Sequence, residues 1–133
     1  MKGEEVKRKM TVKECYEHAV SFLPEKPEEN PDLQRFMTAW CNLLLAENLE
    51  SENFYRRANE MEELAVPAKI ETEDDEIPYN SLLVEKAFPY GMARWVFREN
   101  DDVSASHEYY GLYVNAVKEA TPALVTEIED VYR

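Results

Sequence analysis

Apolar residues recur at three- and four-residue steps over most of this chain, and this spacing predicts amphipathic helices. A first helix is predicted to begin at Thr11, which forms a capping box with Glu14, and to stop at Pro24. A second helix is expected after Asn30 and Pro31, because a capping residue before a proline marks a helix start. Its apolar stripe is the cleanest in the sequence: Leu33, Phe36, Met37, Trp40, Cys41, Leu44 and Leu45.

The middle of the chain is more polar than the helices around it. A short third helix is predicted over residues 52–63, where the apolar positions are sparse. The segment that follows, residues 65–79, contains two prolines and a dense acidic run, a composition that does not propagate a helix. We expect it to be an extended, solvated connection.

Two further helices are predicted in the C-terminal half. The first is capped by Asn80 or Ser81 and reaches about Asn100. Pro89 lies inside its apolar pattern, so either the helix kinks there or a new helix starts with this proline in its first turn. After a break of acidic residues that supplies an aspartate cap, a last helix is predicted over residues 103–120.

The two ends of the chain carry weaker patterns. Residues 1–10 are mostly charged and are expected to be a flexible leader, whereas residues 121–133 alternate in a strand-like period and are expected to be an extended tail. Residues 11–133 are therefore predicted to be one all-α domain, a bundle of four to five helices. The expected leading core residues are Phe36, Trp40, Leu44, Phe88, Met92, Trp95, Tyr113 and Val117.

The charge of the chain narrows the range of partners. Its 133 residues include 28 acidic and 15 basic ones, for a formal net charge of −13. A surface of this sign lacks the cationic footprint of a DNA-binding protein, so sequence-specific nucleic-acid binding is not expected. No apolar stretch approaches the roughly 20 residues that cross a bilayer, so no membrane partner is expected either.

Motifs of common enzyme classes are missing from the sequence. Its three glycines are too few for phosphate-binding loops, and no histidine lies in an HExxH pair. Cys15 and Cys41 lie within apolar stripes and are predicted to be buried, reduced thiols. Together with His18 they could approach a zinc ion, but their core positions favour simple burial. We therefore expect no catalytic residue, no cofactor and no metal site.

Acidic residues offer two weaker hypotheses. The run from Glu71 to Glu76 has the charge of a cation site but lacks the glycine and terminal glutamate of a calcium loop, so a solvated or partner-facing surface is favoured. Glu47 with Glu50, or Glu60 with Glu63, would place two carboxylates on one helical face. Helical magnesium-dependent nucleotide pyrophosphohydrolases use this arrangement, but so acidic a chain also produces it by chance.

Two glycines fall inside helical patterns, where each costs about 1 kcal/mol relative to alanine. Gly91 and Gly111 are both placed in this way. Close approach of the last two helices would explain them, and a hinge over residues 89–91 is the alternative.

Several short segments of the sequence, taken in their order along the chain, resemble those of a known class of proteins. They are an opening Met10-Thr11-Val12, a long amphipathic helix, Asp75-Glu76-Ile77-Pro78-Tyr79 leading into Phe88-Pro89-Tyr90-Gly91-Met92-Ala93, an acidic break at residues 99–102, and Tyr109-Tyr110-Gly111-Leu112-Tyr113. In this layout the chain from Thr11 to Arg133 resembles the small helical head–tail connector or adaptor proteins of tailed phages and prophages. The resemblance implies a non-enzymatic subunit of a ring, present in the cytoplasm of a bacterial host during assembly and in the virion.

A connector of this kind would bind other copies of itself and portal or tail proteins. Contacts between subunits are predicted at apolar residues in the two segments expected to be extended. These residues are Ile77, Pro78, Tyr79, Leu124, Val125, Ile128, Val131 and Tyr132. Two alternatives remain open: the helical nucleotide pyrophosphohydrolase, and an acidic helical regulatory or adaptor protein.

Overall fold

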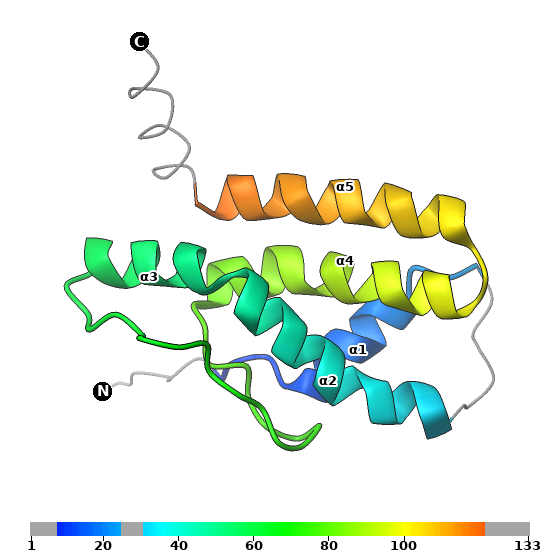
Figure 1. Ribbon diagram of the computed structural model, residues 1–133, viewed down its shortest axis with the longest axis horizontal. Coiled ribbons are helices and arrows are strands. Elements are labelled where there is room, and N and C mark those ends of the chain that lie inside the picture. The colour runs from blue at the N-terminus through cyan, green and yellow to red at the C-terminus, as the bar shows by residue number, and fades with distance from the viewer. Residues whose placement is uncertain (1–7, 25–30, 122–133) are drawn as a thin grey trace, which may run out of the picture.

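The computed structural model describes residues 8–24 and 31–121, and these residues form helices joined by irregular connections (Figure 1). The helices are α1 (Val12–Val20), α2 (Pro31–Glu47), α3 (Leu49–Ala58), α4 (Ser81–Glu99) and α5 (Val103–Ala120). Across the described ranges the only β pairing is a single bridge between Thr11 and Glu76. The prediction of an all-α, single-domain bundle is confirmed.

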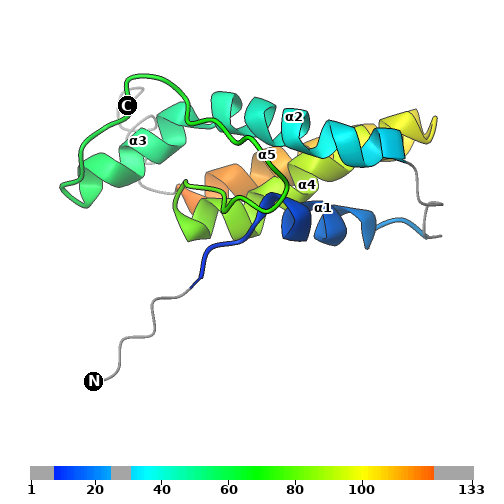
Figure 2. The same cartoon turned by 90° about the horizontal axis from the view of Figure 1, so that it is seen from below.

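Helix α4 is the centre of the bundle. It runs antiparallel beside α5 in Figure 1 and lies between α1 and α2 in Figure 2, and it packs against all three of these helices. The reason is its composition, because a helix that is apolar on several sides must be covered on several sides. The residues it buries include Leu83, Val84, Ala87, Phe88, Met92, Ala93, Val96 and Phe97.

The question of Pro89 is decided by the continuity of α4. The helix runs through Pro89 without a second start, so the predicted alternative of a new helix at this residue is wrong. Two residues later, an added Cβ at Gly91 would lie 2.5 Å from Cδ2 of Leu44 and 2.9 Å from Cδ1 of Tyr113. The close-approach explanation is therefore confirmed at Gly91, and it is wrong at Gly111, where a Cβ would meet nothing within 4 Å.

The helix starts agree with the local sequence signals. Thr11 accepts a hydrogen bond from Glu14 N at 3.1 Å, and Thr11 N donates to the Glu14 carboxylate at 2.9 Å, which completes the predicted capping box. Asn80 caps α4, and Asp102 caps α5 by accepting from the backbone N–H of Ala105 at 3.0 Å.

The helix ends were predicted less well. Helix α1 ends at Val20, before Pro24. The third helix was placed at residues 52–63, but α3 starts at Leu49 and stops at Ala58. Two residues later, Glu60 has a φ of 56°, in the left-handed region that interrupts a right-handed helix.

The connection between α3 and α4 is irregular, as predicted, but the prediction that it is solvated is wrong for its apolar residues. Ile70 is 5% exposed. Its backbone exchanges hydrogen bonds of 2.7 and 3.0 Å with the amide side chain of Asn42 in α2. The Asn53 side chain holds the backbone of Leu64 in the same two-way manner, at 2.7 and 2.9 Å. Two helix asparagines thus fix the connection against the bundle.

The start of the described chain is also held in place. Ile77 N donates to the Met10 carbonyl at 2.8 Å, Val12 N donates to the Asp75 carbonyl at 3.0 Å, and Lys9 Nζ donates to the Pro78 carbonyl at 2.9 Å. The prediction of a flexible leader is therefore wrong for residues 8–10, while residues 1–7 lie outside the described residues, as does the predicted tail after Thr121. In the ranges that are described, none of the helices has the length and apolarity needed to span a bilayer.

The predicted core residues are found at the centre of the bundle or at its edge. Trp40, Leu44, Phe88, Met92 and Tyr113 are buried, and Phe36, Trp95 and Val117 are partly buried against them. The two cysteines are buried and free, as predicted. Burial raises the pKa of both thiols, to about 12 in the case of Cys41.

Candidate functional site

The predicted contact residues of the connection belong to the chain's own core. Ile77 and Tyr79 are both fully buried, and the Tyr79 hydroxyl donates to the carbonyl of Leu45 at 2.7 Å. Pro78 is partly buried between them. The prediction that these side chains are exposed to another copy is wrong, because the connection folds back over α2 and buries its alternate apolar residues there. Leu124, Val125, Ile128, Val131 and Tyr132 lie outside the described residues.

A buried arginine joins α2, α4 and α5. Arg94 of α4 is 9% exposed, and its Nη2 donates to both carboxylate oxygens of Glu47 at 2.7 and 2.8 Å. The hydroxyl of Tyr113 in α5 donates to the same carboxylate at 2.8 Å. The hydroxyl in turn accepts from Nδ2 of Asn48 at 2.7 Å. A charged pair and a chain of hydrogen bonds thus fix the place where the three helices meet.

Aromatic rings surround the guanidinium group. The Cζ atom of Arg94 lies 4.0 Å from the ring centre of Trp95, 4.9 Å from that of Tyr113 and 5.1 Å from that of Tyr110. These distances are in the range of cation–π attraction. The Nε atom of Arg94 is buried and has no acceptor among the described residues. The carboxylate of Glu47 therefore compensates only one edge of this cation.

The protonation state of the Tyr113 hydroxyl follows from the groups around it. Burial, and secondly its hydrogen bond to the Glu47 carboxylate, raise the pKa of the Tyr113 phenol well above its ordinary value. The hydroxyl therefore stays protonated at neutral pH and acts as a donor to Glu47. This group is suited to holding the carboxylate in place.

A second buried carboxylate fixes α3 to the start of α4. Glu52 is 1% exposed and accepts from Asn80 N at 2.7 Å, from Asn80 Nδ2 at 3.0 Å and from Arg56 Nε at 2.7 Å. Sequence analysis did not identify Glu52, although the four-residue spacing to Arg56 is a local sign of an ion pair. Its link to Asn80 is visible only in the folded chain.

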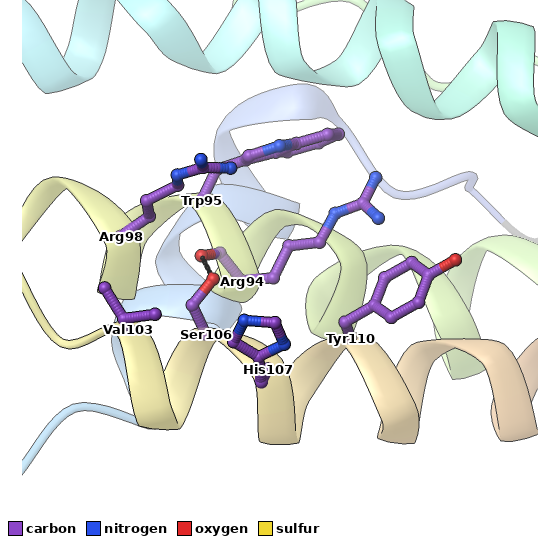
Figure 3. Close-up of a pocket in the computed structure, with 7 residues that line it drawn as sticks. All are labelled: Arg94, Trp95, Arg98, Val103, Ser106, His107 and Tyr110. Atoms are coloured by element: carbon purple, nitrogen blue, oxygen red, sulfur yellow. Dashed lines mark hydrogen bonds between the residues drawn. The ribbon is translucent and has the colours of Figure 1, made fainter.

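Two hollows lie on the surface beside Arg94, and they are separated by Tyr110, which is 50% exposed. The first hollow has a volume of about 300 Å³ and lies between α4 and α5 (Figure 3). It is lined by Arg94, Trp95, Arg98, Val103, Ser106, His107 and Tyr110. The second hollow, of about 420 Å³, is lined by Glu47, Tyr113, Val114, Val117 and Lys118, and by Tyr110 again.

The first hollow is lined by basic residues, although the protein is strongly acidic. Arg94, Arg98 and His107 line it, and no acidic residue is among the described residues that do so. The side chains of Arg98 and His107 make no hydrogen bond or ion pair with any other part of the described chain. Ser106 is occupied, because its hydroxyl donates to the carbonyl of Arg94 at 2.7 Å. Free cationic groups beside apolar walls suit a carboxylate carried on an apolar segment.

The paired glutamates of the sequence do not form the arrangement that a pyrophosphohydrolase would use. Glu47 ends α2 and Glu50 lies in α3, so this pair is divided between two helices. Glu60 lies beyond the end of α3, and Glu63 is exposed and 3.6 Å from Nε of Arg57. The prediction that either pair shares one helical face is therefore wrong.

The other candidate metal ligands are also dispersed. The described part of the chain holds no group of three or more histidine, cysteine, aspartate or glutamate residues placed to bind a metal ion. His18 is exposed, and its ring packs 5.5 Å from that of Phe22. In the acidic run, Asp75 accepts from the backbone N–H groups of Glu71 and Thr72, both at 3.0 Å, and these bonds lower the pKa of its carboxyl. This aspartate stabilises a turn.

Comparison of the chain with protein-family models, with curated protein sequences and with solved structures finds no match in any of the three. The site just described is therefore interpreted from its own chemistry.

Proposed function

We propose that this protein is a non-enzymatic assembly protein that binds other copies of itself, and portal or tail proteins, in the manner of a phage or prophage head–tail connector. The connector assignment comes from the resemblance in the sequence. The observation that carries the proposal is the exposed face around the first hollow, where Val103 is 59% and Tyr110 50% exposed beside the exposed side chain of Arg98. Exposed aromatic and arginine side chains in one place are typical of protein-binding surfaces.

The rigidity of this face supports a role in binding. Arg94 is held by Glu47 and stacked against aromatic rings of α4 and α5, so the floor of the hollow is fixed before any partner arrives. A preformed surface loses little conformational entropy when it binds. The contact of α4 with α5 is also the most extensive in the described chain, which places the face on its firmest part.

The hydrogen bonds that the Glu47 carboxylate already accepts also favour assembly over nucleotide hydrolysis. Glu47 already accepts from Arg94 and Tyr113, so a magnesium ion at this position would have to displace an arginine. The net charge of −13 repels phosphate groups, which suits a subunit that surrounds or borders nucleic acid without binding it.

Light scattering coupled to size-exclusion chromatography, over a wide range of protein concentration, tests the proposal. We expect an oligomer of defined mass, and we expect deletion of residues 123–133 to abolish it while the helical circular dichroism and the melting temperature are retained. A single copy at every concentration would overturn the proposal. If the truncated protein unfolds, the tail is part of the core and the assignment of contacts to it is wrong.

A second assay addresses the hydrolase alternative. Pyrophosphate release from nucleoside triphosphates with magnesium, lost in a folded Glu47→Gln or Glu60→Gln protein, would overturn the assembly proposal in favour of an enzyme. We expect no difference among the wild-type protein and the two variants.

A further inference from the structure

We infer that the first hollow, lined by Arg94, Arg98 and His107, is the acceptor for the acidic segment 124–132 of a neighbouring copy of this chain. This inference rests on the proposed function, in which copies assemble, and it names the two surfaces that meet.

The acceptor offers the guanidinium of Arg98, whose charge the rest of the described chain leaves uncompensated. Arg98 is exposed, and neither it nor His107 has a side-chain partner in the described ranges. Arg94 contributes further positive charge to the hollow. Glu47 accepts from its Nη2, but its Nε has no acceptor among the described residues. Figure 3 shows Arg98 and Trp95 extending from α4 and His107 and Tyr110 extending from α5, with the Arg98 guanidinium beside the Trp95 ring and the Arg94 side chain between Trp95 and Tyr110.

The segment has the complementary pattern. Residues 124–132 read LVTEIEDVY, with Glu127, Glu129 and Asp130 set among apolar residues. In an extended conformation, Glu127 and Glu129 would share one face with Val125 and Val131 and would lie about 7 Å apart. Two carboxylates between two valines match a hollow in which the Arg98 guanidinium and the His107 imidazole can donate hydrogen bonds beside the rings of Trp95 and Tyr110.

The hollow and the start of the segment lie at opposite ends of α5. The hollow is built on the first half of α5, at Val103, Ser106, His107 and Tyr110, whereas the tail follows Thr121 at the other end. About 22 Å of helix separates Ser106 from Thr121. Between copies, a donor and an acceptor at opposite ends of one helix form a head-to-tail contact, and repetition of such a contact gives a ring when the rotation from copy to copy closes.

The net charge of the protein explains why two copies would attract one another only over a small area. Two copies that each carry a formal charge of −13 repel one another over most of their surfaces. A cationic hollow is a position at which an acidic segment of the next copy gains attraction. Because exposed charges are screened by salt, we expect the contact to weaken as the salt concentration rises.

Charge reversal in the full-length chain tests the inference. Arg98→Glu in the hollow, or Glu127→Lys with Glu129→Lys in the segment, should raise the apparent dissociation constant of the oligomer by at least about tenfold. All three substitutions in one chain should restore assembly. Mixing the Arg98→Glu protein with the Glu127→Lys/Glu129→Lys protein in equal amounts should also restore it, because each hollow then meets a segment of opposite charge in the other variant. The matched control is Lys86→Glu, which makes the same charge change on the exposed side of α4 outside the hollow and should have no effect.

The outcomes of these experiments distinguish failure of this inference from failure of the proposed function. If wild-type protein assembles and Arg98→Glu assembles equally well, the hollow is not the acceptor, while the assembly proposal stands. If the triple variant assembles but the equal mixture does not, the segment folds back on its own chain and the contact between copies is wrong. A wild-type protein that stays single at every concentration overturns both. Circular dichroism monitors folding, and Arg98→Gln, which removes the charge without adding a carboxylate, replaces Arg98→Glu if that variant unfolds.

Discussion

The carboxylate of Glu47, at the last residue of α2, lies 2.7 and 2.8 Å from Nη2 of Arg94, in the middle of α4. The side chain of Arg94 is 10% exposed and that of Glu47 is 41% exposed, so the cation is buried while its partner stays in contact with solvent. A buried charge depends on its partner more than an exposed one does. The pair therefore fixes the crossing of α2 over α4 and, through Tyr113, the position of α5.

Loss of the Glu47 carboxylate should destabilise the fold. Glu47→Ala leaves the buried guanidinium of Arg94 without its acceptor and should lower the free energy of unfolding by about 2 kcal/mol, a value reduced from the fully buried case because Glu47 is partly exposed. Urea denaturation followed by circular dichroism measures this difference. Glu50→Ala, at an exposed position of α3, is the control and should change the value by less than about 0.5 kcal/mol. Equal effects of the two substitutions would contradict the role given to Glu47.

The two helical glycines should respond in opposite directions to alanine. At Gly91 a Cβ would lie 2.5 Å from Leu44 and 2.9 Å from Tyr113, and the resulting overpacking should outweigh the gain in helix propensity. We expect Gly91→Ala to lower the free energy of unfolding by about 1–2 kcal/mol. Gly111→Ala meets nothing within 4 Å and should raise it by up to about 1 kcal/mol. Thermal denaturation of the two variants side by side checks both signs, and a stabilised Gly91→Ala would show that the three helices are less tightly packed there.

Glu52 should be among the most sensitive carboxylates of the chain. Glu52→Ala removes the acceptor of the Asn80 backbone and side-chain N–H groups, which are buried at the first turn of α4, and of Nε of Arg56. Because buried donors without acceptors are costly, the free energy of unfolding should fall by about 3 kcal/mol. Chemical denaturation measures the loss. Glu63→Ala removes only an exposed pair with Arg57 and provides the comparison, with an expected loss below about 1 kcal/mol.

The stability of the protein should decrease in alkaline solution. Burial raises the pKa of Cys41 from 9.0 to about 12, and it raises the pKa of Cys15 as well. Between these two values the unfolded chain loses the Cys41 proton while the folded chain keeps it, so this contribution to stability is complete below pH 9 and is lost as the pH rises toward 12. Urea denaturation from pH 8 to pH 11 should show the decrease.

Comparison with a cysteine variant isolates the thiol contribution to this alkaline decrease. Cys41→Ala lowers stability at all pH values by removing a buried side chain, but its stability should decrease less steeply between pH 9 and pH 11 than that of the wild-type protein. Parallel curves for the two proteins would mean that the Cys41 thiol does not carry the effect.

Local signals were the part of the fold that sequence analysis predicted well. The cap at Thr11 involves atoms within three residues, and so do the caps at Asn80 and Asp102; each was predicted and is present. The last helix was predicted at the bounds that the structure shows. These features succeed because a side chain and a backbone amide close in sequence are forced together by the helix itself.

Long-range pairing decided what sequence analysis got wrong. Ile77 and Tyr79 resemble exposed apolar residues in a polar stretch, but the stretch is fixed to α2 by Asn42 and its apolar side chains enter the core. Gly91 and Gly111 have the same helical context, and only the neighbours of each position show that one is crowded and the other open. No local pattern contains this information.

By itself, the sequence determined the helical class, the capped starts of α1, α4 and α5 and the strong negative charge, because periodicity, capping and composition are properties of neighbouring residues. Only the tertiary structure decided that Glu47 binds Arg94, that Glu52 accepts from Asn80, and that Arg98 and His107 have no side-chain partner within residues 8–24 and 31–121. The physical reason is that burial and charge compensation depend on which helix faces come together, and a chain with 28 acidic residues offers many equivalent partners to each arginine until folding selects one.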